Sequence, residues 1–275
     1  MIINKHYQKL LSGGGEMGER IRKKDWDKTK VGNIENWPQS LYTTLSIILN
    51  SKFPMFLWWG PELICFYNDA YRPSLGMEGK HPSILGQRAE DAWPEIWDTI
   101  KPLIDQVVET DESIWREDQL IPIYRNGKIE DVYWTFSYSP VKDESGYTAG
   151  VLVTCNETTQ KIQILEEIKE REAQLNFTIN AAGMGTWDFN PITDKFSINA
   201  RLKKWLGFSP DSQISLPEML SRITESDREK VTNSIENVLK QGSAGNYEVE
   251  YSVINPINKK TAVIKHLRLY QKYFI

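Results

Sequence analysis

The chain has 275 residues, of which 40% are apolar, 11% aromatic and 25% charged, and its formal net charge is −4. Domains commonly hold about 150 residues, so this length predicts two domains, each large enough to form a core. The composition excludes a wholly disordered or fibrous chain, and the lack of a clustered basic face argues against a nucleic-acid partner. Two cysteines, Cys65 and Cys155, are too few for a disulfide framework or a four-thiolate zinc site, and they suit a reducing compartment.

No stretch of the sequence reaches the roughly 18 consecutive apolar residues that a membrane-spanning helix requires. The best candidate, residues 53–67, is interrupted by Pro54, Gly60 and Glu62. The amino terminus lacks the apolar core and the small-residue cleavage site of a signal peptide. We therefore expect a soluble, cytoplasmic protein without a membrane span.

Residues 1–39 are expected to form an extension in front of the first domain. The three glycines at 13–15 are interpreted as a flexible joint, because they lack the Gly-Lys-Ser/Thr ending of a phosphate-binding loop and no apolar strand precedes them. Trp26 and Trp37 make the extension too apolar for a free tail, so it should pack on the first domain.

Residues 40–156 indicate an α+β domain with one antiparallel sheet and helices on one of its faces. Helical spacing of apolar residues predicts helices, whereas alternation or short apolar runs predict strands. The expected helices are 38–50 and 93–110, and the expected strands are 54–59, 63–67, 113–125, 130–141 and 147–155. Asn126-Gly127 predicts a hairpin turn between the third and fourth of these strands. Pro102 should kink or divide the second helix.

The segment 157–181 is predicted to be a linker helix, because its apolar residues recur at close to heptad spacing among Glu and Lys. The apolar positions of this stripe are Ile162, Leu165, Ile168, Leu175 and Ile179. The pattern favours a coiled coil with a second copy of the chain, and so a homodimer. The alternative is a single amphipathic helix that lies on its own domain.

Residues 182–275 repeat the first domain on a coarse scale, with Trp58 and Trp187 in corresponding strands. The expected strands are 187–191, 195–199, 247–254 and 260–274, and the expected helices are 200–208, 216–223 and 226–243. The first unit has a fifth strand for which the second has no counterpart. We therefore expect a fragment whose second domain lacks its last strand.

Dispersed motifs carry a resemblance to a known family. In the first unit they are GGGEMGERIR (13–22), WPQSL (37–41), SKFPMFLWWGPEL (51–63), YNDAYRP (67–73), WPEIWDTI (93–100) and FSYSPVKDESG (136–146). In the second unit they are Gly185 to Asn190, Leu206 to Phe208, Asp227-Arg228 and Tyr247 to Tyr251. The chain resembles tandem PAS sensor domains of a bacterial sensor histidine kinase.

The resemblance implies, for each unit, a five-stranded antiparallel sheet with helices over one face, enclosing a pocket. It also implies two-component signalling, in which downstream kinase domains transfer phosphate from ATP to a histidine. This chain shows no phospho-accepting histidine motif and no catalytic motif. Glu157-Thr158-Thr159 stands where the family often has Asp-Ile-Thr, so Glu157 and Thr158 are candidates for signal relay. The alternative is that the threonines only cap the helix.

Cofactor signatures are missing from the sequence. A haem-binding domain of this kind needs an axial histidine in its pocket helix, and residues 93–110 contain none. A flavin photoadduct needs a cysteine in an Asn-Cys-Arg-Phe-like setting, which neither Cys65 nor Cys155 has. No cluster of His, Cys and Asp has metal-ligand spacing. We expect no identifiable cofactor and no metal, although an unknown small ligand remains open.

Aromatic residues are the remaining candidates for a binding site. The ligand-binding candidates are Trp58, Phe66, Tyr71, Trp97, Trp134, Phe136 and Tyr138. They suit a flat or apolar ligand, and the alternative is a filled aromatic core. The sequence therefore predicts a sensory module that relays a signal through its linker helix to a downstream histidine kinase. A constitutive dimerisation scaffold is the first alternative, and a small-molecule enzyme is a weaker one.

Overall fold

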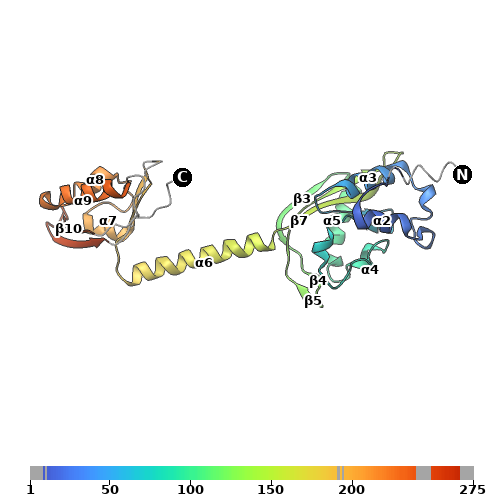
Figure 1. The fold of residues 1–275 in the computed structure, drawn as a ribbon, viewed down its shortest axis with the longest axis horizontal. Helices are drawn as coiled ribbons and strands as arrows, with labels where there is room; N and C mark the ends of the chain where they lie inside the picture. Colours follow the sequence, from blue (N-terminus) through green and yellow to red (C-terminus); the bar gives the residue numbers. More distant parts are fainter. Residues whose placement is uncertain (1–8, 10, 191–192, 194, 240–248, 267–275) are drawn as a thin grey trace. The chain divides into compact units, whose positions relative to one another are not determined.

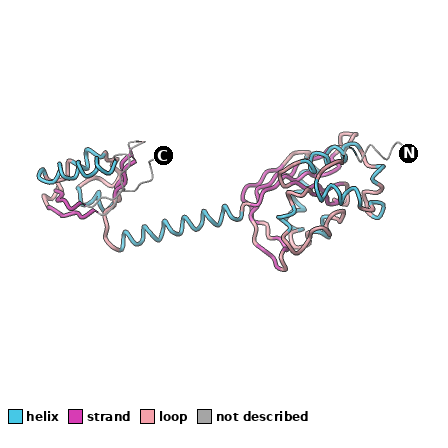
Figure 2. Tube along the Cα trace, viewed as in Figure 1, coloured by secondary structure: helices cyan, strands magenta, loops and turns pink. Residues whose placement is uncertain are grey.

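A computed structural model describes residues 9, 11–190, 193, 195–239 and 249–266 of the chain. The chain divides into two compact units, Met1–Ile168 and Lys169–Ile275, and each is described by itself. Figure 1 labels the elements, and Figure 2 shows that both units combine helices with strands. The first unit contains an α+β fold with one five-stranded sheet.

The sheet of the first unit is antiparallel throughout, in the order β2-β1-β7-β6-β3. Its strands are β1 (Met55–Trp59), β2 (Ile64–Tyr67), β3 (Ile114–Leu120), β6 (Tyr133–Lys142) and β7 (Thr148–Glu157). In β6, Trp134, Phe136 and Tyr138 are buried, whereas the residues between them are only half-buried. This alternation follows from the two-residue period of a strand with one face on the core.

The Asn126-Gly127 turn belongs to a short hairpin outside the main sheet. The hairpin consists of β4 (Ile123–Arg125) and β5 (Lys128–Glu130). Asn126 and Gly127 have φ values of 54° and 79°, as a tight hairpin turn of the primed kind requires. The single strand expected over 113–125 is wrong, because the chain leaves the sheet after Leu120, just before Pro122, which has no N–H for a ladder.

The helix expected over 93–110 is shorter than predicted. A separate turn, α4 (Ala89–Ala92), precedes it, and α5 runs over Trp97–Thr110. The structure does not divide α5 at Pro102. The helix begins only five residues earlier, so the missing N–H of Pro102 removes one hydrogen bond, the one to the backbone carbonyl of Asp98. Asp98 is exposed, so water can bond to this carbonyl instead.

Helices and turns cover both faces of this sheet, so the expectation of helices on one face is wrong. The amino-terminal segment contains α2 (Gly15–Lys23), α3 (Gln39–Asn50) and the 3-10 turns Trp26–Lys28 and Ile34–Asn36, and another such turn is Arg72–Leu75. Phe66 pairs with Leu57, so it faces away from Trp58. On that side Trp26 stacks on Phe66 at 4.9 Å between ring centroids, and Trp37 meets it edge-on at 5.6 Å. The aromatic residues of the extension therefore cover the second face.

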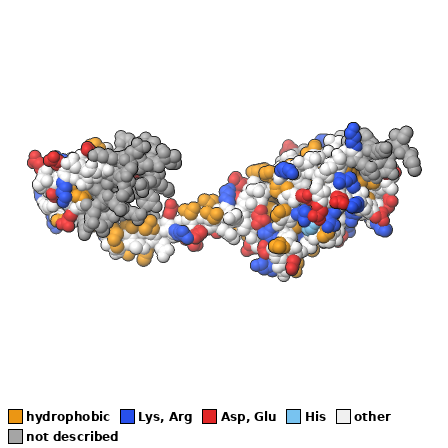
Figure 3. Space-filling model, in the orientation of Figure 1, with side chains coloured by type: hydrophobic (Ala, Val, Ile, Leu, Met, Phe, Trp, Pro, Cys, Tyr) orange, Lys and Arg blue, Asp and Glu red, His pale blue; other side chains and the backbone are white. Residues whose placement is uncertain are grey.

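The linker segment forms α6 (Thr159–Ala181), and none of its residues is buried. Leu165, Ile168 and Leu175 are 44%, 48% and 60% exposed, and Figure 3 shows hydrophobic side chains on the surface along α6. Among the residues described, no helix has both the length and the apolar character needed to cross a bilayer.

The second unit follows the predicted order of elements. They are β8 (Trp187–Asn190), β9 (Lys195–Ile198), α7 (Ala200–Leu206), α8 (Leu216–Leu220), α9 (Glu225–Leu239), β10 (Val249–Ile254) and β11 (Thr261–His266). The described strands pair as two antiparallel hairpins, β8 with β9 and β10 with β11. Its core includes Leu206, Val231 and Tyr251. The expected strand residues 267–274 lie outside the described residues.

Candidate functional site: an aromatic cavity

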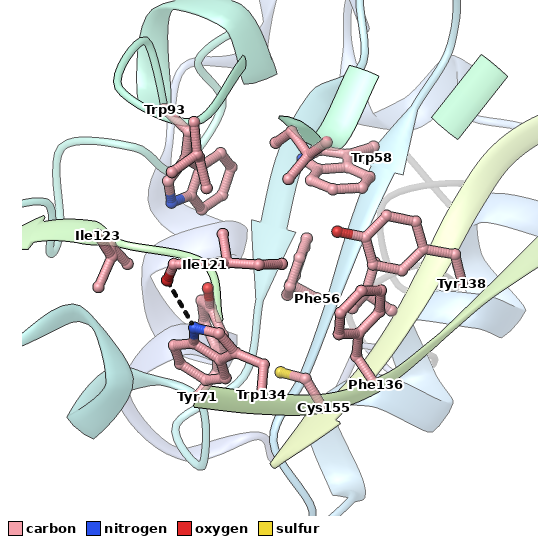
Figure 4. A pocket seen from close by; sticks show the side chains of 13 residues that line it. Phe56, Trp58, Tyr71, Trp93, Ile121, Ile123, Trp134, Phe136, Tyr138 and Cys155 are labelled. Carbon is pink, nitrogen blue, oxygen red and sulfur yellow. Dashed lines mark hydrogen bonds between the residues drawn. The ribbon is translucent and has the colours of Figure 1, made fainter. Parts of the chain in front are cut away.

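A small cavity lies on the Trp58 face of the first unit's sheet, and residues of α5 and of the β4–β5 hairpin complete its wall. Its volume is about 40 Å³. Its lining side chains, most of which are labelled in Figure 4, are Phe56, Trp58, Tyr71, Trp93, Ile96, Ile100, Ile121, Ile123, Trp134, Phe136, Tyr138, Val153 and Cys155. We call this space the aromatic cavity.

Strand register brings the sheet residues of the cavity together. Phe56 pairs with Val153 across β1 and β7, and Val153 pairs with Tyr138 across β7 and β6. Cys155 and Phe136 are the next partners along the same two strands. Because directly paired residues of an antiparallel sheet share a face, all five side chains point to the cavity side.

Contacts between rings hold the cavity wall in place. Trp58 meets Tyr138 edge-on at 5.2 Å between ring centroids, and it meets Phe56 edge-on at 4.8 Å. Phe136 and Tyr138 lie 4.8 Å apart at a tilt. Edge-on and tilted arrangements match the charge distribution of aromatic rings, so these contacts add to the free energy gained from burial alone.

The size of the cavity limits what it can hold. A cavity needs about 10–15 Å³ of such space to hold one water molecule, and an engineered protein cavity of about 150 Å³ binds benzene. A space of about 40 Å³ therefore accommodates only a few non-hydrogen atoms unless the wall moves.

The lining carries no Asp, Glu, Lys, Arg or His side chain. Burial raises the pKa of the Tyr71 and Tyr138 hydroxyls well above their ordinary value, and it raises the pKa of the Cys155 thiol in the same way. All three groups stay neutral at any physiological pH, because burial penalises the charged form. The cavity therefore offers neutral donors and ring faces, but no acid, base or thiolate nucleophile.

The structure places five of the seven predicted ligand-binding candidates around the cavity, namely Trp58, Tyr71, Trp134, Phe136 and Tyr138. Phe66 does not line it, because its pairing with Leu57 turns it to the opposite face. Trp97 also lies outside the lining. It is half-buried in the first turn of α5, where Ile96 and Ile100 face the cavity instead.

Sequence reasoning missed several lining residues, and the signals for them differ. Phe56 stands two residues before Trp58 on the same strand, so alternation alone could have assigned it to the cavity face. Cys155 follows Val153 by the same rule. Ile121 and Ile123 reach the cavity only because the chain leaves β3 and folds back as a hairpin, which no local pattern indicates.

An ion-pair network lies beside the cavity, at the amino-terminal end of α6, which we call the root of this helix. Arg125, in the same short strand as the cavity residue Ile123, donates two hydrogen bonds to the Glu157 carboxylate at 2.8 and 2.9 Å. It also donates to the carboxylate of Glu130 at 2.8 Å and to the carbonyl of Ser74 at 3.1 Å. The Arg125 side chain is only 12% exposed. Its hydrogen bonds raise its own pKa and lower that of Glu130.

The predicted relay residues Glu157 and Thr158 therefore lie where a strand becomes a helix. Thr158 donates its N–H to the carbonyl of Tyr133 at 2.8 Å, and the hydroxyl of Thr159 accepts from the N–H of Tyr133 at 3.0 Å. The Thr159 hydroxyl thus bonds to strand β6. This arrangement differs from the helix-capping alternative for that residue.

Comparisons with known proteins agree with this architecture. Residues 64–163 match a family model described as PAS fold. A curated relative, the blue-light-activated histidine kinase of Brucella anthropi, is 23% identical over 214 residues, which cover 71% of this chain and 41% of that protein. The chain thus spans about two fifths of the length of this relative.

Solved structures of related description also align with the chain. A sensory box sensor histidine kinase from Vibrio cholerae aligns over 42% of this chain and 89% of its own, with 18% identity and a TM-score of 0.31. The PAS domain of Bordetella pertussis BvgS aligns over 49% and 97%, with 16% identity and a TM-score of 0.35. Residues 64–163, which lie in the first unit of this chain, are thus similar in sequence to the PAS fold family.

Proposed function

We propose that this chain is a sensory module in which the occupancy of the aromatic cavity is relayed to α6. The observation that carries the proposal is the position of Arg125. It lies two residues beyond the cavity residue Ile123 and binds both oxygens of Glu157, which ends β7 two residues before α6 begins. One side chain therefore links the cavity wall to the root of the linker helix.

The physical basis is a displacement of the hairpin. A ligand that fills the cavity contacts Ile121 and Ile123, and any displacement of the wall falls on this hairpin side, because the sheet side of the wall is fixed by strand pairing. Arg125 moves with Ile123 on the same three-residue strand. A bidentate arginine–carboxylate pair is directional, so this movement changes how firmly Glu157 and the first turn of α6 are held.

The output is proposed to pass through a dimer. The exposed stripe on α6 suits a parallel coiled coil with a second copy, and a change at its root would bias the packing of the two helices. The curated relative is named a histidine kinase. We infer that downstream kinase domains of a longer, cytoplasmic protein receive this signal, and that they carry the phosphotransfer chemistry.

Hydrogen–deuterium exchange at the root of α6 tests the relay. Arg125→Met keeps an unbranched stem but removes the guanidinium group and its hydrogen bonds to Glu157, so amides of residues 158–165 should exchange faster, by about tenfold. Arg116→Met is the matched control, because Arg116 is an exposed arginine of β3 whose one hydrogen bond within the described part of the chain goes to the neighbouring backbone carbonyl of Trp115. Unchanged exchange in Arg125→Met would show that the pair does not hold the helix root.

A constitutive scaffold is the second candidate function, and one observation favours it. A cavity of about 40 Å³ is small enough to be read as ordinary imperfect packing of an aromatic core. The two candidates differ in one measurable property: a scaffold admits no small molecule to the cavity. An enzyme is disfavoured, because no acidic or basic side chain lines the space.

A flavin does not fit this cavity. Three fused rings need far more than about 40 Å³. The one lining thiol, Cys155, lies on strand β7 between cavity side chains and is held neutral by burial. The proposed sensing therefore does not rest on a flavin photoadduct.

A further inference from the structure

Two hydroxyls that face the aromatic cavity, those of Tyr71 and Tyr138, form no hydrogen bond with the residues that the structure describes. Tyr71 and Tyr138 are each 4% exposed. Burial is the main cause of the raised pKa values of both hydroxyls. In Figure 4 the Tyr138 hydroxyl points inward, toward Trp58 and Phe56 on the same face of the sheet. Buried donors of this kind are normally satisfied, so their open positions indicate where an acceptor atom would bind.

The other residues that line the cavity determine which charge a ligand can carry. An anion would lose its hydration with no cationic side chain to replace it, because no Lys, Arg or His lines the space. Ring faces attract cations, but the organic cations that such rings commonly hold, the quaternary ammonium ions, are too large for about 40 Å³. A neutral ligand is left.

We infer that the aromatic cavity binds a neutral molecule of about two to four non-hydrogen atoms that carries a hydrogen-bond acceptor, held by the hydroxyls of Tyr138 and Tyr71. This inference rests on the proposed function and specifies its ligand. The rings of Trp58, Phe56 and Phe136 contact the apolar part. Because the binding free energy that each ligand atom can contribute is limited, a four-atom ligand binds no tighter than about 40 µM.

The test uses two probes of the same shape on the full chain. Acetonitrile carries an acceptor nitrogen, and propyne replaces that nitrogen with a C–H group. Binding is followed by the NMR shifts of the indole N–H signals of the lining residues Trp58, Trp93 and Trp134. Wild-type protein should bind acetonitrile about fivefold to tenfold more tightly than propyne.

Variants separate recognition of the acceptor from simple filling of the space. Tyr138→Phe and Tyr71→Phe should each reduce this preference and still admit propyne. Tyr147→Phe, at a 75% exposed position outside the lining, should leave it unchanged. Equal binding of the two probes by wild-type protein would overturn the inference about the ligand, with the cavity still a binding site. Exclusion of both probes would overturn the proposed function itself and favour the scaffold.

Discussion

The Asp69 carboxylate accepts hydrogen bonds from the backbone N–H groups of Glu16 and Met17, both at 2.9 Å, and so caps the first turn of α2 from a position more than fifty residues later in the chain. The glycines at 13–15 all have positive φ and bring the helix terminus up to this carboxylate. A negative charge at a helix N-terminus is favourable, because the first N–H groups are unpaired and the helix dipole is positive there. In the structure, residues 13–15 thus have a defined backbone conformation that places the start of α2 at the Asp69 carboxylate. The sequence suggested a flexible joint instead.

Gly15→Ala should detach α2 from the rest of the first unit. A Cβ at this position would lie 1.9 Å from Asp69 Oδ2, whereas a Cβ at Gly32 would meet nothing within 4 Å. Both glycines have positive φ, 57° and 74°, so both substitutions share a backbone cost of about 1–2 kcal/mol. Only Gly15→Ala adds a collision with the cap, and it should cost about 2–4 kcal/mol.

Urea unfolding followed by tryptophan fluorescence measures both glycine variants, because eight of the ten tryptophans lie in the first unit. Gly32→Ala measures how much the positive φ alone lowers the free energy of unfolding, because its Cβ meets no other atom. Equal destabilisation by the two variants would mean that the contact between the Gly15 backbone and Asp69 contributes nothing beyond backbone strain.

The pH dependence of stability should report a second contact of α2. His81 Nδ1 and the Tyr67 hydroxyl are 2.8 Å apart, and His81 Nε2 is 3.2 Å from a Glu16 oxygen. Burial lowers the pKa of His81, and the nearby Arg72 and Arg20 act in the same direction, while Glu16 opposes them. The unfolded chain therefore binds a proton at His81 more readily than the folded chain does.

His81 thus makes its full contribution to the free energy of unfolding above the ordinary histidine pKa of about 6.5. This contribution is lost as the pH falls from there through the lower pKa that His81 has in the folded chain. Urea unfolding at pH 7.5, 6.5 and 5.5 checks this. The His81→Gln variant should lose less stability across that range than wild-type protein. A steeper loss in the variant would mean that folding raises the pKa of His81.

Charges on the apolar stripe of α6 should dissociate the proposed dimer. Leu165→Asp and Ile168→Asp place a carboxylate in the predicted seam, where desolvation and repulsion between copies oppose pairing. Gln163→Asp adds the same charge at an exposed position that the heptad spacing directs away from the seam. Sedimentation equilibrium should give dimers for wild-type protein and Gln163→Asp, and monomers for the other two. A dimer that persists in Leu165→Asp and Ile168→Asp would place the interface elsewhere.

Local patterns in the sequence predicted those parts of the fold that depend on neighbouring residues. The alternation of Trp134, Phe136 and Tyr138 was sufficient to assign them to the buried face of a strand, because the two-residue period is a local property. Phe66 was placed wrongly, since its face depends on pairing with Leu57 across a turn.

Contacts that join distant segments could not be predicted in this way. Arg125 and Glu157 are 32 residues apart, and their pairing depends on how the β4–β5 hairpin folds back beside the sheet. Asp69 and α2 come together only when the amino-terminal extension packs on the first unit. The cap and the link between cavity and helix therefore became visible only in three dimensions.

Filling the aromatic cavity is proposed to alter the amino-terminal end of α6 through Arg125. Hydrogen–deuterium exchange of residues 158–165 should be measured with and without saturating acetonitrile, in wild-type protein and in Arg125→Met, with indole N–H shifts verifying that the probe has bound. Acetonitrile should change the exchange of these amides in wild-type protein and leave that of Arg125→Met unaltered. An identical change in both proteins, or none in wild-type protein with the probe bound, would contradict the account.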